Sequence, residues 1–209
     1  MTGAVEPRLA AGLSALGLEL APAQVAALAM LVAELAEWNT RFNLTAITEP
    51  AEVVDKHLLD SLAVLPHLKG LQVADVGSGA GFPGLPLAIA DLDRQYTLIE
   101  STGKKARFLH YIVGQLNLPN VEVVQGRAEA YEPRRPYDSV VARALGSLAE
   151  FVRVAGHLAG RRGRLLAMKG KVPEHELLAI PAGWKALAVH PIRVPGLDAE
   201  RCVVELARV

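Results

Sequence analysis

Asp75-Val76-Gly77-Ser78-Gly79-Ala80-Gly81-Phe82-Pro83-Gly84 is the stretch of sequence that decides the fold of this chain. It follows an apolar run, residues 71–76, that predicts a buried strand, and it precedes residues 85–90, which predict the first turns of a helix. A strand that ends in a glycine loop and opens a helix brings backbone N–H groups and a helix N-terminus to one point. Glycine there permits a positive φ and the close approach of a ligand. The stretch therefore predicts a cradle for a nucleotide-like cofactor, without specifying which one.

Strand and helix patterns alternate from Leu71 onward, which predicts a parallel sheet with right-handed crossovers. The predicted strands are residues 73–76, 96–100, 121–125, 139–143 and 164–168, and the predicted helices are 84–91, 103–116 and 147–159. The first 66 residues have helical patterns instead. One helix is expected from Pro22 to about Trp38-Asn39, and another after Thr48-Glu49-Pro50. We expect residues 1–66 to form a helical extension packed on a domain of residues 67–209.

The C-terminus departs from this alternation. After a short predicted helix at residues 173–180, two strand patterns, 184–194 and 202–209, are joined by a loop that is too short for a parallel crossover. They should therefore pair as an antiparallel hairpin. A mostly parallel α/β sheet that ends in such a hairpin is the Rossmann-like architecture of class I S-adenosylmethionine (SAM) methyltransferases, whereas a dinucleotide-binding domain would continue its crossovers. The sequence thus favours SAM as the cofactor.

Several residues are candidates for the cofactor site. Gly77, Gly79 and Gly81 form a Gly-x-Gly-x-Gly loop, and the prolines at 83 and 86 remove N–H donors that a pyrophosphate would need. Glu100 ends the second strand, where a carboxylate accepts the ribose hydroxyls of either kind of cofactor. Asp75 either fixes the loop by accepting backbone N–H groups or contacts the amino group of the cofactor, and we expect the first role.

Three further positions complete this predicted site. Ala128 and Glu129 follow the third strand and would line an adenine slot, with Glu129 accepting from the exocyclic amine. Arg143 ends the fourth strand beside an apolar run, so its guanidinium needs an anionic partner. A cofactor carboxylate, an RNA phosphate, Glu129 or Asp75 would each serve.

The formal net charge of zero conceals an uneven distribution. Residues 1–60 carry three basic and eight acidic side chains, whereas residues 101–171 carry thirteen basic and five acidic ones. Several basic clusters in one half of the chain favour a polyanion-binding face.

The sequence lacks the marks of a membrane or secreted protein. No apolar run approaches the ~20 residues that span a membrane, and the N-terminus lacks the features of a signal peptide. The single cysteine, Cys202, excludes an internal disulfide and a cysteine zinc cluster. We expect a cytoplasmic monomer that has no membrane contact and no structural metal.

Six motifs in the same order resemble those of the bacterial 16S ribosomal RNA guanine-N7 methyltransferase family, ribosomal RNA small subunit methyltransferase G, also called glucose-inhibited division protein B. They are residues 43–47 (Asn-Leu-Thr-Ala-Ile), 56–61 (Lys-His-Leu-Leu-Asp-Ser), 75–84, 104–109 (Lys-Lys-Ala-Arg-Phe-Leu), 126–129 (Gly-Arg-Ala-Glu) and 142–144 (Ala-Arg-Ala). The resemblance implies SAM as cofactor and a guanine of 16S rRNA in the small subunit as acceptor. It implies cofactor contacts at Gly77, Phe82, Ala128, Glu129 and Arg143.

The expected chemistry agrees with this resemblance. Guanine N7 is already nucleophilic in the neutral base, so its methylation needs in-line placement and no general base or covalent intermediate, with Arg143 a candidate for positioning only. Cys202 lies in an apolar strand pattern and is expected to fill the core. Candidate RNA-binding residues are Asn39, Arg41 and Asn43 in the interhelical loop, Lys56 and His57 on the next helix, and Lys104, Lys105, Lys169 and Lys171.

Two other functions stay open from the residues alone. A SAM methyltransferase that acts on a small molecule or a protein would have an enclosed apolar pocket instead of a basic rim. A non-catalytic RNA-binding or assembly protein would be expected to have a damaged glycine loop.

Overall fold

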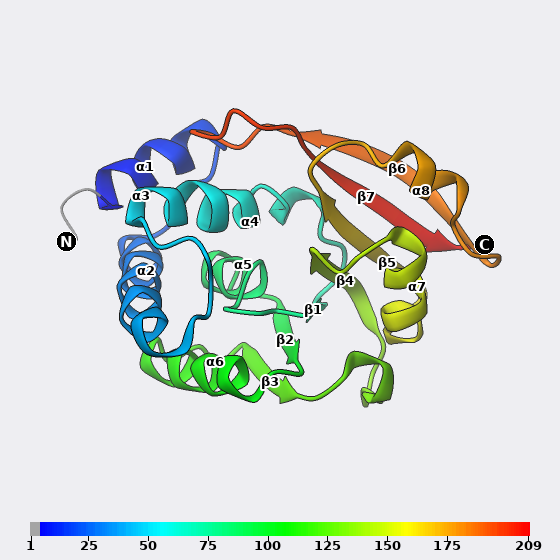
Figure 1. Ribbon diagram of the computed structural model, residues 1–209, viewed down its shortest axis with the longest axis horizontal. Helices are drawn as coiled ribbons and strands as arrows, with labels where there is room; N and C mark the ends of the chain where they lie inside the picture. The colour runs from blue at the N-terminus through cyan, green and yellow to red at the C-terminus, as the bar shows by residue number, and fades with distance from the viewer. Residues whose placement is uncertain (1–4) are drawn as a thin grey trace.

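A computed structural model describes residues 5–209 and contains one seven-stranded sheet (Figure 1). The strand order is β3-β2-β1-β4-β5-β7-β6. The strands are β1 (Gln72–Val76), β2 (Gln95–Glu100), β3 (Val121–Gln125), β4 (Tyr137–Arg143), β5 (Ala159–Lys169), β6 (Trp184–Ile192) and β7 (Arg201–Arg208). Strands β1 to β5 are parallel, and β7 runs antiparallel to both β5 and β6. The predicted sheet and its closing hairpin are confirmed.

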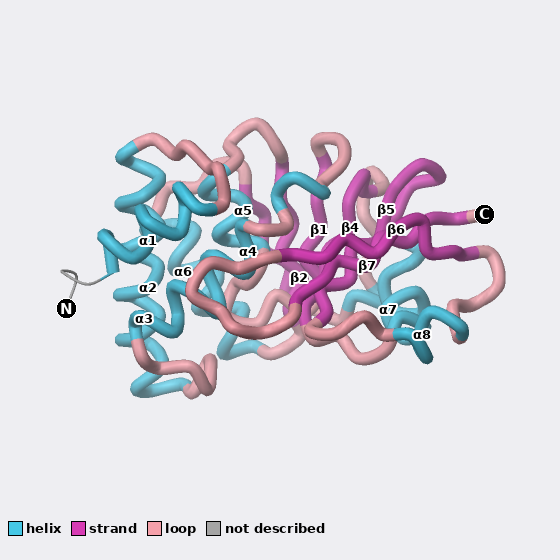
Figure 2. The backbone as a smooth tube through the Cα atoms, turned by 90° about the horizontal axis from the view of Figure 1, so that it is seen from above, coloured by secondary structure: helices cyan, strands magenta, loops and turns pink. Residues whose placement is uncertain are grey.

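Helices cover both faces of this sheet, as the view from above shows (Figure 2). The α-helices are α1 (Val5–Ala15), α2 (Pro22–Phe42), α3 (Pro50–Val53), α4 (Asp60–Leu62), α5 (Gly84–Ala90), α6 (Gly103–Gln115), α7 (Leu148–Ala155) and α8 (Glu174–Leu178). Three short 3₁₀ turns are η3 (Leu65–His67), η4 (Ala128–Ala130) and η5 (Gly156–Leu158). A π-helical segment, η2 (Val54–Leu59), connects α3 to α4.

Side-chain alternation along the strands explains the two covered faces. On β2, Leu98 packs in the core that contains α2, α5 and α6, whereas the next residue, Ile99, packs in the core that contains α7. On β1, Ala74 likewise joins the α7 side, while Val73 packs with residues of α5. Successive strand residues point to opposite faces, so a strand buried on both sides is apolar almost throughout.

The N-terminal helices share a core with the sheet domain. Leu28 and Leu35 of α2 belong to the same apolar cluster as Leu85 of α5 and Phe108 of α6. The Gln24 side chain also donates to the carbonyl oxygens of residues 89 and 90, at 2.8 and 3.0 Å. The helical character of this region is confirmed, and the division into residues 1–66 and 67–209 stays a prediction.

The end of α2 differs from the prediction. The helix continues to Phe42 and ends at Asn43, whose φ of 48° is left-handed, so Asn39 and Arg41 lie on the helix and not in the loop. The reason is local. The Asn39 side chain donates to the carbonyl of Thr45 and accepts its N–H, at 3.0 and 2.9 Å. Asn39 therefore closes the turn after the helix, and the short polar segment starts four residues later than expected.

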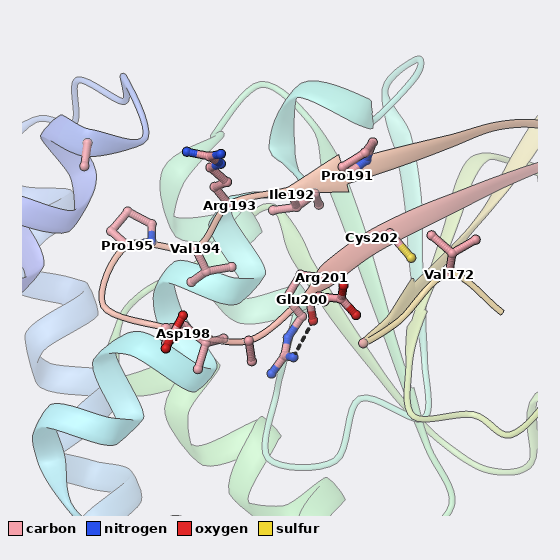
Figure 3. A pocket seen from close by; sticks show the side chains of 14 residues that line it. Val172, Pro191, Ile192, Arg193, Val194, Pro195, Asp198, Glu200, Arg201 and Cys202 are labelled. Carbon is pink, nitrogen blue, oxygen red and sulfur yellow. Dashed lines mark hydrogen bonds between the residues drawn. The ribbon is translucent and has the colours of Figure 1, made fainter.

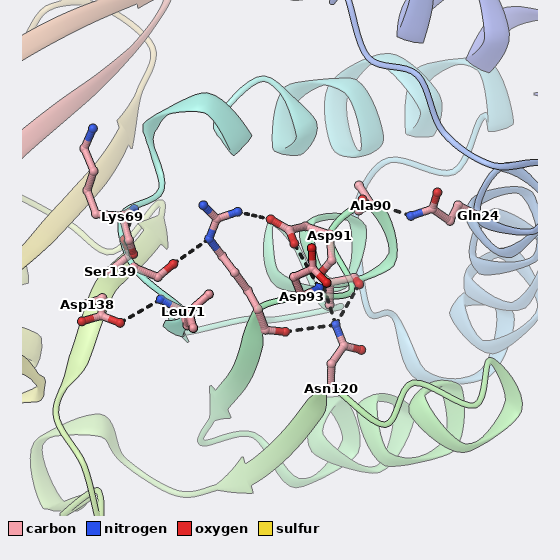
Figure 4. A network of polar contacts seen from close by, with 12 residues as sticks. Gln24, Lys69, Leu71, Ala90, Asp91, Asp93, Asn120, Asp138 and Ser139 are labelled. Atoms are coloured by element: carbon pink, nitrogen blue, oxygen red, sulfur yellow. Dashed lines mark hydrogen bonds and ion pairs between the residues drawn. The ribbon is translucent and has the colours of Figure 1, made fainter.

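Hydrogen bonds fix the edge of the sheet where the parallel strands begin (Figure 4). Asn120, just before β3, donates to the carbonyl oxygens of Ala88, Asp91 and Arg94, at 3.0 to 3.3 Å. Asp138 of β4 accepts the backbone N–H groups that lead into β1. Within residues 5–209, no helix has both the length and the apolar character that crossing a membrane requires.

Candidate functional site

A pocket of about 280 Å³ lies at the edge where the parallel strands end. The glycine loop after β1 forms one wall, the end of β4 a second, and the N-terminal region a third. Its lining residues are Leu44, Thr45, His57, Gly77, Ser78, Gly79, Ala80, Phe82, Lys105, Arg143 and Ala144. Ligands of open α/β sheets bind at this edge, and six of the predicted site residues line this pocket.

The glycine loop needs its glycines for two different reasons. Gly77, Gly79 and Gly81 have φ values of 70°, 60° and 94°, which residues with a side chain rarely adopt. A Cβ at Gly79 would meet nothing closer than 3.9 Å, so that position faces open space, whereas a Cβ at Gly81 would lie 2.2 Å from the Leu85 side chain. Gly79 thus keeps the pocket open, and Gly81 lets the loop pack on α5. Gly77 faces the Leu145 side chain, which would lie 3.4 Å from a Cβ.

Six N–H groups of this loop are already used within the protein. Those of Gly77 and Ser78 donate to Ile99, and those of Gly81 and Phe82 donate to Ser78. Gly79 and Gly84 donate to the carboxylates of Glu100 and Asp75, at 2.8 and 2.9 Å. A pyrophosphate would need a set of free donors here, and the loop does not offer one. The loop therefore suits a ligand that packs against backbone more than a phosphate.

Asp75 lies behind the loop and not in the pocket. Its side chain is fully buried, Oδ2 accepts the Gly84 N–H, and Oδ1 has no hydrogen-bond partner. Burial raises the pKa of this carboxyl to about 7. Of the two roles considered for Asp75, the geometry matches the fixing of the loop.

Glu100 joins the loops that follow three strands. Its Oε1 accepts the N–H of Thr102 at 2.7 Å while Oε2 holds Gly79, and its backbone carbonyl accepts the N–H of Gly126 at 3.0 Å. Ala128 and Glu129 follow in η4, with Ala128 buried and Glu129 exposed. Glu100, Ala128 and Glu129 therefore lie at the same edge of the sheet as the pocket, but they are not among the residues that line it.

Arg143, His57 and Phe82 form a stacked group in the pocket wall. The rings of His57 and Phe82 stack with centroids 4.5 Å apart, and the Arg143 guanidinium lies 5.6 Å from the Phe82 centroid. Arg143 Nη2 and the Lys56 carbonyl oxygen both lie 3.1 Å from His57 Nδ1, and His57 Nε2 lies 3.0 Å from the Thr45 hydroxyl, so both ring nitrogens are engaged. Burial and the Arg143 charge lower the pKa of His57 to about 4, so the ring is neutral near pH 7.

The anionic partner of Arg143 is a residue that sequence reasoning missed. Arg143 Nη1 donates to Asp60 Oδ2 at 3.2 Å, and neither Glu129 nor Asp75 pairs with it. The other oxygen of Asp60 accepts from Arg201 Nε at 2.9 Å. The sequence signal for this residue is its place in the motif of residues 56–61, on the same helical segment as His57. A π-helical turn, common at functional sites, changes the helical spacing there.

The remaining candidate RNA-binding residues are dispersed. Lys105 lines the pocket and Lys104 is half-buried beside it at the start of α6. Lys56 pairs with Glu52 at 2.6 Å, and Lys169 is held by Glu176 and the Gly146 carbonyl. Arg41 pairs with Glu37 at 3.6 Å on the exposed end of α2, and Lys171 is exposed.

A larger pocket, of about 750 Å³, lies beside the loop between β6 and β7 (Figure 3). Its wall includes Pro191, Pro195, Cys202 and the Arg201 side chain that holds Asp60. It lacks the glycine loop and the stacked group, so the smaller pocket is the better candidate for chemistry. No cluster of three or more metal-ligating side chains occurs among residues 5–209.

Comparison with known proteins decides the family. The family model described as "rRNA small subunit methyltransferase G" matches residues 24–204. The protein of that name from Azoarcus sp. (strain BH72) is 47% identical over 202 residues, which cover 96% of this chain and 95% of that protein. The chain belongs to the rRNA small subunit methyltransferase G family. The family predicted from the sequence motifs is therefore confirmed.

Other similarities agree with this membership of the methyltransferase G family. The same-named protein of Xanthomonas euvesicatoria pv. vesicatoria (strain 85-10) is 48% identical, covering 96% of this chain and 93% of that protein. A solved structure of the glycopeptide N-methyltransferase MtfA with S-adenosyl-L-homocysteine matches with a TM-score of 0.62 at 11% identity, covering 73% of this chain and 87% of that one. TrmN from Thermus thermophilus matches with a TM-score of 0.57 at 17% identity, covering 82% and 53%. At these low identities the structures show the class I methyltransferase fold alone.

Proposed function

We propose that this protein transfers the methyl group of SAM to N7 of a specific guanine in 16S rRNA of the small ribosomal subunit. The observation that carries the proposal is membership of the rRNA small subunit methyltransferase G family over residues 24–204. In this proposal the protein acts as a monomer in the cytoplasm, where its ribosomal RNA substrate lies.

The glycine-loop pocket fits SAM better than a dinucleotide. Most backbone donors in the loop are satisfied internally, and the absence of side chains at Gly77 and Gly79 leaves room in the pocket lining. We assign the surface of Gly77 and Gly79 to the methionine part of SAM and the Phe82 and Arg143 wall to its carboxylate end. Glu100, Ala128 and Glu129, on the neighbouring loops, would hold the ribose and adenine.

SAM supplies an electrophilic methyl group on a sulfonium, and the protein supplies placement. The N7 lone pair of guanine is available in the neutral base, so the protein needs only to hold it in line with that methyl group. His57 is suited to orientation more than to proton transfer, because its ring is neutral and both its nitrogens are engaged by Arg143 and Thr45. Arg143, anchored by Asp60, fixes the position of the stacked wall.

RNA would approach from the rim of this pocket. Lys105 reaches the lining and Lys104 lies next to it, so phosphates beside the target guanine would meet two positive charges at the start of α6. Arg107 is exposed on the same helix. This basic rim favours RNA over a small neutral acceptor.

The direct test is methyl transfer in solution. The purified protein is incubated with methyl-labelled SAM and 16S rRNA that lacks the modification, and the RNA is then digested to nucleosides. Label in 7-methylguanosine at one site supports the proposal. Label in another nucleoside, or transfer only to a small molecule or protein, contradicts it. The Gly77→Asp variant serves as the inactive control.

A further inference from the structure

A bulge in β5 places two arginines at the far edge of the sheet, where the parallel strands begin. Tyr137 of β4 pairs with Ala159, and Ser139 pairs with Arg164, with a register shift between them. The segment Gly160-Arg161-Arg162-Gly163 of β5 therefore lies opposite the single residue Asp138 and protrudes. Arg161 and Arg162 are both exposed at its tip.

The shape of this bulge is held from within. A Cβ at Gly163 would lie 2.6 Å from the Tyr137 carbonyl and 2.8 Å from the Gly160 nitrogen, so no side chain fits there. The Arg164 guanidinium donates to the carbonyl oxygens of Arg162 and Gly163, at 2.6 and 3.1 Å, and its Nε contacts Glu205 at 3.1 Å. The bulge is therefore built by specific contacts that direct its arginines outward.

A second arginine pair lies next to it. Gly160 packs against Pro136, with an ideal Cβ 3.5 Å from the proline ring, and Arg134 and Arg135 come directly before that proline. Both are exposed. The fold thus gathers four exposed guanidinium groups from two loops; we name Arg134, Arg135, Arg161 and Arg162 the four-arginine surface.

Nearby acids do not neutralise this surface. Among residues 5–209, none of the four arginines has an ion pair within 4.0 Å. Asp138 is used by the backbone N–H groups of Leu71 and Gln72 (Figure 4), and Glu205 is used by Arg164 and His190. Glu132 is the one exposed acid in the adjoining loop. Four like charges held together favour a polyanion, and guanidinium groups match phosphate geometry.

We infer that the four-arginine surface binds the phosphate backbone of the substrate RNA at a second place, away from the methyl-transfer pocket. This inference rests on the proposed function for the identity of the RNA. Strand β4 separates the two places: its seven residues, at ~3.3 Å each, span roughly 20 Å. The surface therefore takes part in docking a long, folded RNA and not in the chemistry at the target base.

The test compares three forms of the full-length protein. One has all four arginines changed to Gln, one has all four changed to Lys, and a control carries Arg153→Gln with Lys185→Gln, two exposed positions on α7 and β6. Binding to a full-length 16S rRNA transcript is measured across a salt titration. SAM affinity is measured by calorimetry, and the KM for RNA and kcat are measured separately.

The affinity of the Gln variant for the transcript should fall about tenfold or more at moderate salt. The slope of its log binding constant against log salt concentration should be shallower by about 3. Its KM for RNA should rise while kcat at saturating RNA and SAM affinity stay unchanged. The Lys variant should keep most of the affinity. Unchanged RNA affinity in the Gln variant, or an equal loss in the control, overturns the inference. Absence of methyl transfer to rRNA by the unaltered protein would refute the proposed function alone, because the RNA-binding comparison still tests the surface.

Discussion

Asp60 Oδ2 accepts a hydrogen bond from Nη1 of Arg143 at 3.2 Å, and this contact ties the helical segment before the sheet to the end of β4. The Asp60 side chain is 4% exposed, and its second oxygen holds Arg201 at the start of β7. One carboxylate thus aligns three segments that are far apart in the sequence. Together with the Lys56 carbonyl, which accepts from the same Nη1 at 2.9 Å, it holds Arg143 beside Phe82 and His57.

Asp60→Asn should destabilise the fold, because two partly buried arginines would lose their anionic partner. We expect a loss of about 1–3 kcal/mol in the free energy of unfolding, toward the low end because both arginine side chains retain solvent contact. Urea denaturation measures it. Asp198→Asn, at an exposed acid in the loop before β7, is the matched control and should change stability little. Equal effects of the two substitutions would refute the role given to Asp60.

Gly77→Asp should abolish SAM binding and leave the fold intact. The new side chain would lie in the pocket lining, with its Cβ 3.4 Å from the Leu145 side chain, and would place a negative charge beside the proposed carboxylate end of SAM. We expect the affinity for SAM, measured by calorimetry, to fall by about a hundredfold or more, which is ~2.7 kcal/mol. Gly17→Asp is the control, since Gly17 has the same left-handed conformation, with a φ of 68°, and no neighbour within 4 Å. Unchanged SAM affinity in Gly77→Asp would remove the loop from the cofactor site.

Asp75 should make the stability of the protein fall as pH rises toward neutrality. Its pKa is about 7 in the folded protein against about 3.9 when unfolded. Between those values the folded state binds the proton more tightly, so the contribution of Asp75 is greatest in acid and is lost as pH rises through 7. Asp75→Asn removes this dependence. The free energy of unfolding of the Asn variant minus that of the unaltered protein should therefore rise by roughly 2–4 kcal/mol between pH 4.5 and 7.5.

Denaturation of both proteins across that range measures this difference. The depressed pKa of His57 produces an opposite slope between about pH 4 and 6.5, but it is common to both proteins and cancels. Parallel stability curves would show that the Asp75 carboxyl is ionised in the folded state.

Replacing Lys104 and Lys105 with Gln should weaken RNA binding. Each lysine that contacts a phosphate contributes to the salt dependence of binding. The slope of log binding constant against log salt concentration should therefore become shallower by about 1–2. A filter-binding titration with 16S rRNA measures it. Lys185→Gln, on β6, should leave the slope unchanged. An unaltered slope in the double variant would place the RNA away from the start of α6.

Much of the fold follows from patterns that a sequence shows directly. The β3 bounds agree with the prediction, and the loop between β6 and β7 correctly indicated a hairpin, because its length forbids a crossover. The strand β5 begins five residues before its predicted start, at Ala159. Its first part is the glycine- and arginine-rich bulge, which lacks the apolar pattern of a strand because it protrudes from the sheet.

The site was less accessible to sequence reasoning. Motif residues such as Gly77, Phe82 and Arg143 do meet in one pocket. Thr45 and Asp60 also lie in motifs, residues 43–47 and 56–61, but their contacts with His57 and Arg143 are tertiary and no local pattern encodes them. The partner of Arg143 comes from 83 positions away, directly after a π-helical segment. The role of Asp75 could be anticipated, because an acid just before a glycine loop is suited to bind its N–H groups.

Mass spectrometry of 16S rRNA nucleosides from cells with and without the protein tests the central claim most directly. Cells that lack it should lose 7-methylguanosine at one position of 16S rRNA. The unaltered chain should restore that nucleoside, and Gly77→Asp, expressed at the same level, should not. Full 7-methylguanosine in the cells without the protein, or restoration by Gly77→Asp, would contradict the assignment of this pocket to guanine-N7 methylation.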